Sequence, residues 1–162
     1  MKKALRWSAA GLAFALLCLM AAIRLAPSDP AEWHVDPLTV AHPDSRNSYL
    51  SAPPGVTEAT PDQAGPEFAL DPIALAEVFD KVVMSAPRTR RLAGSPSEGW
   101  TTYVQRSLIM GYPDYISVHA VKLKDGKSAL AIFSRSRFGE GDFGVNAARV
   151  KRWLQALERL AQ

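Results

Sequence analysis

The chain has 162 residues, of which 48% are apolar and 22% are charged, and its formal net charge is +3. This length allows one domain of ordinary size with an accessory segment and excludes a large multidomain enzyme. The composition is neither disordered nor collagen-like. The first 26 residues contribute +4 and the remainder carries −1. We therefore expect no nucleic-acid partner, and none of the usual groove-reading motifs is present.

The N-terminal segment has the pattern of a membrane anchor. An uncharged run over residues 7–23, about 26 Å long as a helix, is preceded by three cations, Lys2, Lys3 and Arg6. Arg24 can extend toward the lipid boundary, which lengthens the span to Ala26. We predict a transmembrane helix over 7–26 that contacts membrane lipid. Because the cations precede it, the N-terminus is expected to stay cytoplasmic and residues 27–162 to be exported.

A cleaved signal peptide is the alternative for this segment. Its cleavage site would need small residues, whereas Arg24-Leu25-Ala26 places an arginine where a small residue is preferred. Cys18 is the only cysteine and lies inside the apolar run. The exported part therefore has no thiol for a disulfide, and its stability must come from a packed core.

Nine prolines punctuate residues 27–72. Proline fixes φ and removes a backbone donor, so we expect neither long helices nor central strands there. We interpret residues 27–70 as a tether or surface wrap, anchored on the domain by Trp33, Tyr49, Leu50 and Phe68. The chain then divides into 1–26 (cytoplasmic tip and anchor), 27–70 (proline-rich segment) and 71–162 (folded domain).

Two amphipathic helices are predicted in the folded domain. Asp71-Pro72 is a good helix start, and apolar residues recur at three- and four-residue intervals up to about residue 85, before Pro87. The second helix spans about 145–161, with an apolar stripe that includes Val150, Trp153 and Leu157.

Strands are predicted at 88–92, 100–110, 115–124 and 127–138. The last two flank Asp125-Gly126, which is a strong hairpin signal. Short turns between consecutive strands imply an antiparallel meander. The expected fold class is α+β: an antiparallel sheet of about four strands packed with two helices.

An arginine cluster is the main candidate site. Residues 27–86 carry −8 and residues 87–162 carry +7, so the halves either neutralise each other or expose a basic face. Arg135 and Arg137 project from one strand face about 7 Å apart, with Arg106 expected on a neighbouring strand. Either they pair internally with Asp114, Glu140 or Asp142, or they bind a carboxylate or phosphate.

The loop after the last strand reads G-x-G-x-x-G over residues 139–144. A dinucleotide site would need a second parallel strand and an acid about twenty residues further on, and the chain contains neither. The loop precedes a helix, whose N-terminus can hold an anion. We therefore add Gly141 and Gly144 to the candidate anion site.

Catalytic and metal signals are weak. His34, Asp36 and His42 match no strong zinc spacing, so we expect no metal and no cofactor. No G-x-S-x-G elbow is present. Asp114 and Asp142 beside the arginines leave a hydrolase-like enzyme as an alternative. A structural scaffold that uses the proline-rich segment as a spacer is another.

Several strings resemble the signature of domain of unknown function family 1499. They are PR at 87–88, TYVQRS at 102–107, GYPDY at 111–115, SRSR at 134–137 and DFGVNAARV at 142–150, with WHVDP at 33–37 similar to the domain start in membrane-tethered members. The similarity covers about 33–160. It implies a bacterial envelope protein and supplies no catalytic residues. Together with the arginines, we expect a non-enzymatic envelope module that binds an anionic lipid head group, glycan or protein acid.

Overall fold

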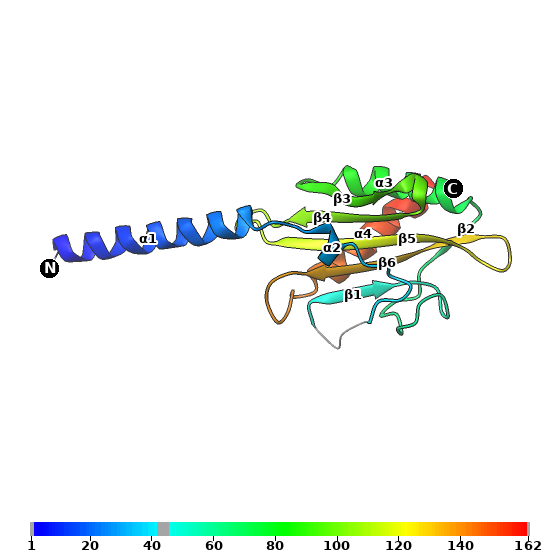
Figure 1. Ribbon diagram of the computed structural model, residues 1–162, viewed down its shortest axis with the longest axis horizontal. Helices are drawn as coiled ribbons and strands as arrows, with labels where there is room; N and C mark the ends of the chain where they lie inside the picture. The colour runs from blue at the N-terminus through cyan, green and yellow to red at the C-terminus, as the bar shows by residue number, and fades with distance from the viewer. Residues whose placement is uncertain (1, 42–45, 162) are drawn as a thin grey trace.

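The computed structural model describes residues 2–41 and 46–161, and it shows an α+β fold built on an antiparallel sheet (Figure 1). Helices α3 (Pro72–Met84) and α4 (Val145–Leu160) cover one face of the sheet. The short helix α2 (Pro30–Trp33) and its neighbours cover the other face. Helix α1 (Lys2–Leu25) projects from one end of the domain. The predicted α+β class is confirmed.

The four predicted strands all form and follow one another across the sheet. They are β3 (Thr89–Ser95), β4 (Trp100–Arg106), β5 (Pro113–Lys122) and β6 (Ser128–Ser136), each antiparallel to the next. Asp125-Gly126 makes the β5–β6 turn as predicted, with φ +86° at Gly126, a conformation that suits glycine. The edge strand β3 has a register shift between Arg91 and Ala93, which marks a β-bulge.

Two further strands come from the proline-rich segment. β1 (Ser48–Ser51) and β2 (Glu67–Phe68) both pair antiparallel with β6. In the part of the chain that the structure describes, the sheet therefore has six strands rather than the predicted four or so. Both strands are very short and lie beyond β6 at the margin of the sheet, where nearby prolines cost no ladder hydrogen bond.

The core lies between the sheet and the two helices. Helix α3 begins as predicted, because the Asp71 carboxylate accepts a hydrogen bond from the Ile73 N–H at 2.9 Å. Phe79 of α3 meets Trp153 of α4 edge to face, with ring centroids 6.2 Å apart. Aliphatic and aromatic side chains of the sheet complete this cluster, among them Tyr103, Ile116, Val118, Leu130 and Ile132.

Stacked rings hold the start of the proline-rich segment on the opposite face. Trp33 stacks on Tyr115 of β5 with centroids 4.0 Å apart. His34 stacks on Trp100 of β4 at the same distance. The polypeptide around α2 therefore lies on the domain as a wrap, and the anchor predicted for Trp33 forms.

Helix α1 includes the apolar run of the N-terminus. Its Trp7, Leu12 and Phe14 side chains are at least 70% exposed, whereas Ile23 in the last turn is buried against the domain. Across residues 2–41 and 46–161, no helix combines the length and apolar character that a membrane crossing requires. The predicted transmembrane span is thus not supported by the structure.

Candidate functional site

The three predicted arginines lie on the face of the sheet that the N-terminal segment covers, and all three donate to its backbone. Arg135 Nη2 donates to the Trp33 carbonyl at 2.9 Å, and Arg137 Nη1 donates to the Pro27 carbonyl at 2.6 Å. Arg106 donates from Nη1 and Nη2 to carbonyls of residues 23 and 26, each at 3.3 Å. The structure therefore brings these guanidinium groups to one segment, and together they hold residues 23–33 on the sheet. We call Arg106, Arg135 and Arg137 the arginine clamps.

Arg135 is the most enclosed of the three. Its guanidinium lies 5.2 Å from the Trp33 ring centroid and 5.1 Å from that of Phe133, at cation–π distance. Burial lowers the pKa of Arg135 to about 10, because desolvation disfavours the charged form. Its Nη1 has no hydrogen-bond partner among the described residues. Such a position holds the wrap in place and leaves little room for a ligand.

Gly141 and Gly144 lie in the loop between β6 and α4, as predicted. Gly144 has φ +77° and precedes the helix. The helix N-terminus is occupied by an internal carboxylate, since Asp142 accepts hydrogen bonds from the Gly144 N–H at 2.9 Å and the Asn146 N–H at 2.6 Å. Gly141 forms an isolated bridge with Arg46. The Gly144 N–H, one of the backbone donors predicted for an anion, is thus used to start α4.

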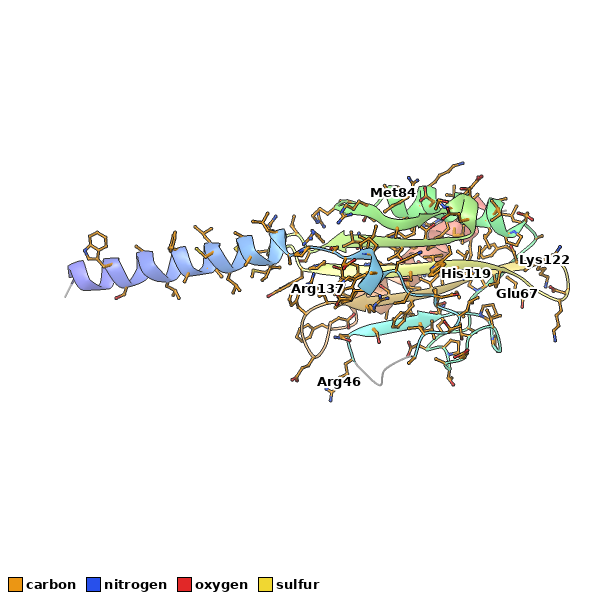
Figure 2. The ribbon with its side chains drawn as sticks, in the orientation of Figure 1. Arg46, Glu67, Met84, His119, Lys122 and Arg137 are labelled. Atoms are coloured by element: carbon orange, nitrogen blue, oxygen red, sulfur yellow. The ribbon has the colours of Figure 1, made fainter. Side chains whose placement is uncertain are left out.

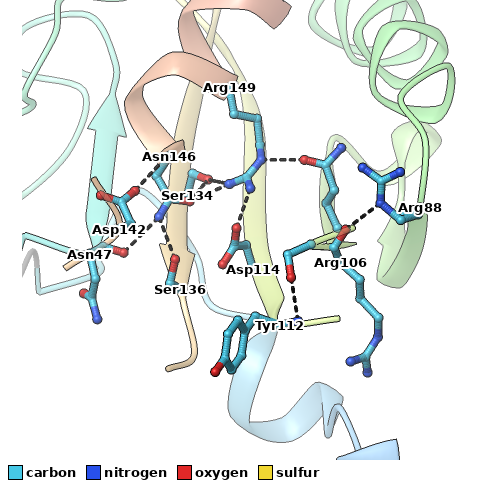
Figure 3. Close-up of polar contacts among 12 residues, drawn as sticks. Asn47, Arg88, Arg106, Tyr112, Asp114, Ser134, Ser136, Asp142, Asn146 and Arg149 are labelled. Atoms are coloured by element: carbon cyan, nitrogen blue, oxygen red, sulfur yellow. Dashed lines mark hydrogen bonds and ion pairs between the residues drawn. The ribbon is translucent and has the colours of Figure 1, made fainter. Parts of the chain in front are cut away.

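A second arginine site lies on the helix-covered face and was missed by the sequence analysis. Arg149 of α4 is buried and forms an ion pair with buried Asp114 at the start of β5 (Figure 3). Its Nε donates to Gln105 Oε1 at 2.7 Å, and its Nη1 donates to Ser134 Oγ at 3.0 Å. Asp114 thus has a partner other than the arginines predicted for it.

Asn146 extends this network to β6 and to Asn47, the residue before β1. It is fully buried, and its Nδ2 donates to the Asn47 carbonyl and to Ser136 Oγ, each at 3.0 Å (Figure 3). Its Oδ1 accepts from Ser134 Oγ at 2.6 Å and from Arg149 Nη1 at 2.5 Å. Buried polar groups need such partners, and here they fix the first turn of α4 on the sheet.

A pocket of about 500 Å³ opens beside the Arg149–Asp114 pair. We call it the arginine pocket, because its lining includes five arginines, Arg88, Arg106, Arg149, Arg152 and Arg159, and one carboxylate, Asp114. Its walls come from the end of α3, the start of β3, the end of β4 and one face of α4. Part of the lining is apolar, including Val82, Ala86, Pro87, Val145, Trp153 and Ala156.

Two of these arginines are free for a ligand. Arg152 and Arg159 are exposed on α4, and neither has a hydrogen-bond or ion-pair partner among the residues that the structure describes.

Arg88, another arginine of the pocket, has a strained backbone. Its φ is +58°, which is unusual for a residue other than glycine. Its Nε donates to the Arg106 carbonyl at 3.0 Å. Strain of this kind is retained where the surroundings demand it, often at functional sites.

The arrangement of arginines around the pocket can bind an anion, and the two acidic side chains predicted beside them already have partners within the protein. Asp114 is held by Arg149, and Asp142 caps α4. Both predicted acids therefore have structural partners within the protein. Planar guanidinium groups bind phosphate and carboxylate through paired hydrogen bonds. An amphiphilic anion suits the mixture of arginines with an apolar wall.

His34 and His119, the two histidines that the structure describes, have structural partners. His119 Nδ1 and Asp36 Oδ1 lie 2.9 Å apart, and His34 stacks on Trp100. His42, a member of the zinc set considered above, lies outside the described residues. Among the residues that the structure describes, no group of three or more histidine, cysteine or acidic side chains is placed so that it could hold a metal ion.

The sequence does contain a signal for the missed network. Asn146 and Arg149 continue the apolar stripe of Val150, Trp153 and Leu157 toward the helix N-terminus. Polar residues within a buried stripe indicate a satisfied polar network. What the sequence cannot supply is the partner, because Asp114 and Gln105 come from different strands.

Comparison with known families agrees with the resemblance. A family described as "Protein of unknown function (DUF1499)" matches residues 46–157, which include every residue that lines the arginine pocket except Arg159. The match begins after α1 and α2. No curated protein is significantly similar to the chain.

Proposed function

The chain belongs to the DUF1499 family, and for this member we propose a non-enzymatic module that binds an anionic ligand in the arginine pocket. The observation that carries the proposal is the lining of that pocket, with five guanidinium groups and one carboxylate. Asp114 neutralises only one arginine. The remaining charge favours an anion at the mouth of the pocket.

The size and the walls of the pocket narrow the ligand class. A volume of about 500 Å³ lies within the usual range for small-molecule sites. Arg152 and Arg159 would bind the charged group, and Trp153 and Val145 offer an apolar surface beside it. Phosphate and carboxylate head groups on lipids, glycans or protein side chains share this chemistry.

Calorimetric titration of the full chain in non-ionic detergent tests the proposal. The probes are inorganic phosphate and phenyl phosphate at about 20 mM salt, where screening is weak. We expect phenyl phosphate to bind more tightly than inorganic phosphate, because of the apolar wall. Absence of binding by the wild-type chain would refute the proposal, and release of phenol would favour the hydrolase alternative.

A matched pair of variants locates the site. Arg152→Gln with Arg159→Gln should weaken binding about tenfold, or about 1.4 kcal/mol. Lys122→Gln with Lys124→Gln removes the same charge from the β5–β6 hairpin, at the end of the domain remote from α1 (Figure 2). The hairpin variant should bind like the wild type. Equal losses in both variants would indicate a general charge effect and would contradict a site in the pocket.

For α1, the proposal is attachment to the inner membrane of a bacterium, with the folded domain on the periplasmic side. The support is the charge asymmetry of the N-terminus together with the exposure of Trp7, Leu12 and Phe14 in the isolated chain. Exposed apolar surface of this extent favours lipid surroundings. A carboxyl-terminal reporter should be active only outside the cytosol, and the chain should sediment with membranes. Recovery of the full-length chain in the detergent-free supernatant would contradict this attachment.

A further inference from the structure

Exposed apolar side chains gather at the end of the domain from which α1 leaves. Leu108 and Ile109 lie in the β4–β5 loop and are 68% and 71% exposed. Phe138 and Phe143 lie in the β6–α4 loop, and Phe143 is fully exposed. We call these four residues the loop-tip patch. A single exposed apolar residue is ordinary, whereas a group on adjoining loops indicates an interaction surface.

Direct contacts join the two loops. The rings of Tyr112 and Phe138 have centroids 5.7 Å apart, and the Arg137 N–H donates to the Pro113 carbonyl at 3.2 Å. A pocket of about 320 Å³ is lined by both loops. The two loops therefore adjoin at this end of the sheet.

The backbone holds Phe143 outward. Phe143 has φ +54°, a left-handed conformation that is uncommon for a bulky residue. The Asp142 side chain and carbonyl fix the turn around it, accepting from the Gly144 N–H at 2.9 Å and the Val145 N–H at 3.1 Å. In water, this position would cost both strain and apolar exposure. Contact with an apolar partner would remove the cost of exposing the Phe143 ring to water.

The base of α1 is held against the β4–β5 loop. Arg24 Nη2 donates to the Ile109 carbonyl at 2.6 Å and to the Leu108 carbonyl at 3.3 Å. A Cβ at Gly111 would lie 2.6 Å from Arg24 Cγ, so only glycine allows this approach. Lipid around α1 would therefore lie beside the β4–β5 loop, which meets the base of this helix (Figure 1).

The positive charge beside the loop-tip patch favours anionic lipids. A pocket of about 330 Å³ beside the β4–β5 loop is lined by four arginines, Arg24, Arg88, Arg90 and Arg106, and its described lining includes no acid. Basic residues around an apolar patch attract the anionic head groups of a membrane surface.

We propose that the loop-tip patch inserts into the surface of an anionic bilayer, the same bilayer that attaches α1, and seats this end of the domain on the membrane. The inference rests on the proposed membrane attachment of α1. It gives the domain a second lipid contact, through Leu108, Ile109 and Phe143, with the arginines on head-group phosphates.

Three fluorescently labelled forms of the full chain test the seating. The native Cys18 carries the label in α1. Cys18→Ser with Phe143→Cys places it on the patch, and Cys18→Ser with Lys124→Cys places it on the β5–β6 hairpin. Each form is reconstituted into phosphatidylglycerol–phosphatidylcholine vesicles that contain lipids with brominated chains. We expect quenching at positions 18 and 143 and none at 124.

The outcomes separate the two proposals. Quenching at 18 with no more quenching at 143 than at 124 overturns the seating and leaves the attachment of α1 intact. Absence of quenching at 18 overturns the attachment, and quenching at 143 would then support the patch alone. In pure phosphatidylcholine vesicles, quenching at 143 should fall about twofold or more, since head-group charge is lost.

A pair of surface variants in the form labelled at position 143 checks the role of the patch. Leu108→Ser with Ile109→Ser should reduce the quenching, because the β4–β5 loop then contributes no apolar surface. Leu160→Ser changes an exposed leucine near the other end of α4 and should leave it unchanged. Equal quenching in both variants contradicts the proposal. Both substitutions lie at exposed positions, so the fold is retained.

Discussion

Arg149 and Asp114 form the ion pair beneath the arginine pocket, and each is buried. A buried pair is costly to assemble, because both charges leave water. Here Gln105, Ser134 and Asn146 accept hydrogen bonds from Nε and Nη1 of the guanidinium. The pair therefore orients the floor of the pocket and leaves Arg152 and Arg159 to meet a ligand.

Removal of one partner should be strongly destabilising. We expect Arg149→Met or Asp114→Leu to lower the free energy of unfolding by about 3–5 kcal/mol, because the other charge stays buried without its partner. Urea denaturation of the full chain in detergent measures the change. The double variant should lose less than the sum of the two single losses, and Arg152→Gln should stay within about 0.5 kcal/mol of the wild type. Additive losses would mean that the two side chains are not coupled.

Phe143 offers a second test at the residue scale. Its φ of +54° suits glycine, so Phe143→Gly should stabilise the chain by about 0.5–1 kcal/mol in detergent. Phe143→Ala keeps the left-handed strain and should give no gain. Comparison of the two unfolding midpoints separates relief of strain from loss of the ring. A gain of the same size in both variants would rule out strain as the cause.

At the level of elements, the wrap around α2 depends on the arginine clamps and on two aromatic stacks. Arg135→Gln with Arg137→Gln should release this segment, because the carbonyls of Trp33 and Pro27 lose their donors. We expect amide hydrogen exchange over residues 29–38 to rise about tenfold or more. The Lys122→Gln, Lys124→Gln variant serves as the control of equal charge. Unchanged exchange in the clamp variant would assign the docking to the ring stacks alone.

The His34 stack gives the wrap a dependence on pH. Burial lowers the pKa of His34 below its ordinary value of 6.5, and Glu98 and Asp36 partly oppose the shift. The unfolded chain therefore binds the proton more readily than the folded chain. The stability from the neutral ring is complete above pH 6.5 and is lost as the pH falls below that value.

Unfolding midpoints between pH 7.5 and pH 5.5 test this dependence. His34→Phe keeps a ring against Trp100 and cannot titrate, so its midpoint should fall less on acidification than that of the wild type. Parallel pH curves for the two chains would show that the His34 ring does not control the effect.

Local signals predicted some elements and not others. The cap of α3 and the Asp125-Gly126 turn are encoded within a few residues, and both form where predicted. The strand β1 is defined by its pairing with β6, far along the chain, so nothing near Ser48–Ser51 indicates it. The burial of Arg149 could not be predicted for the same reason, because it depends on Asp114, which belongs to another element.

At the scale of the whole molecule, the single sheet has apolar side chains on both faces, and each face must be shielded from water. Helices α3 and α4 cover one face, and the wrap covers the other through Trp33 on Tyr115 and His34 on Trp100. Helix α1 contributes little to either face, since Ile23 is the only buried residue among those of α1 whose burial is described. Removal of α1 and removal of the wrap should therefore have very different effects.

Truncation compares the two segments. A chain that begins at residue 23 should keep nearly the full stability of the domain. A chain that begins at residue 39 exposes the outer rings of the sheet and should lose about 3 kcal/mol or more. Urea denaturation of both chains measures the difference. Equal stability of the two would show that the wrap does not cover a structural face.

The bulge in β3 also bears on how neighbouring copies meet. The register shift between Arg91 and Ala93 bends this margin of the sheet, and exposed Arg90 adds charge to it. At the other margin, β1 is only four residues long. Neither border offers a straight, uncharged template for strand addition. Neighbouring copies can therefore lie side by side without joining edge to edge into a continuous sheet.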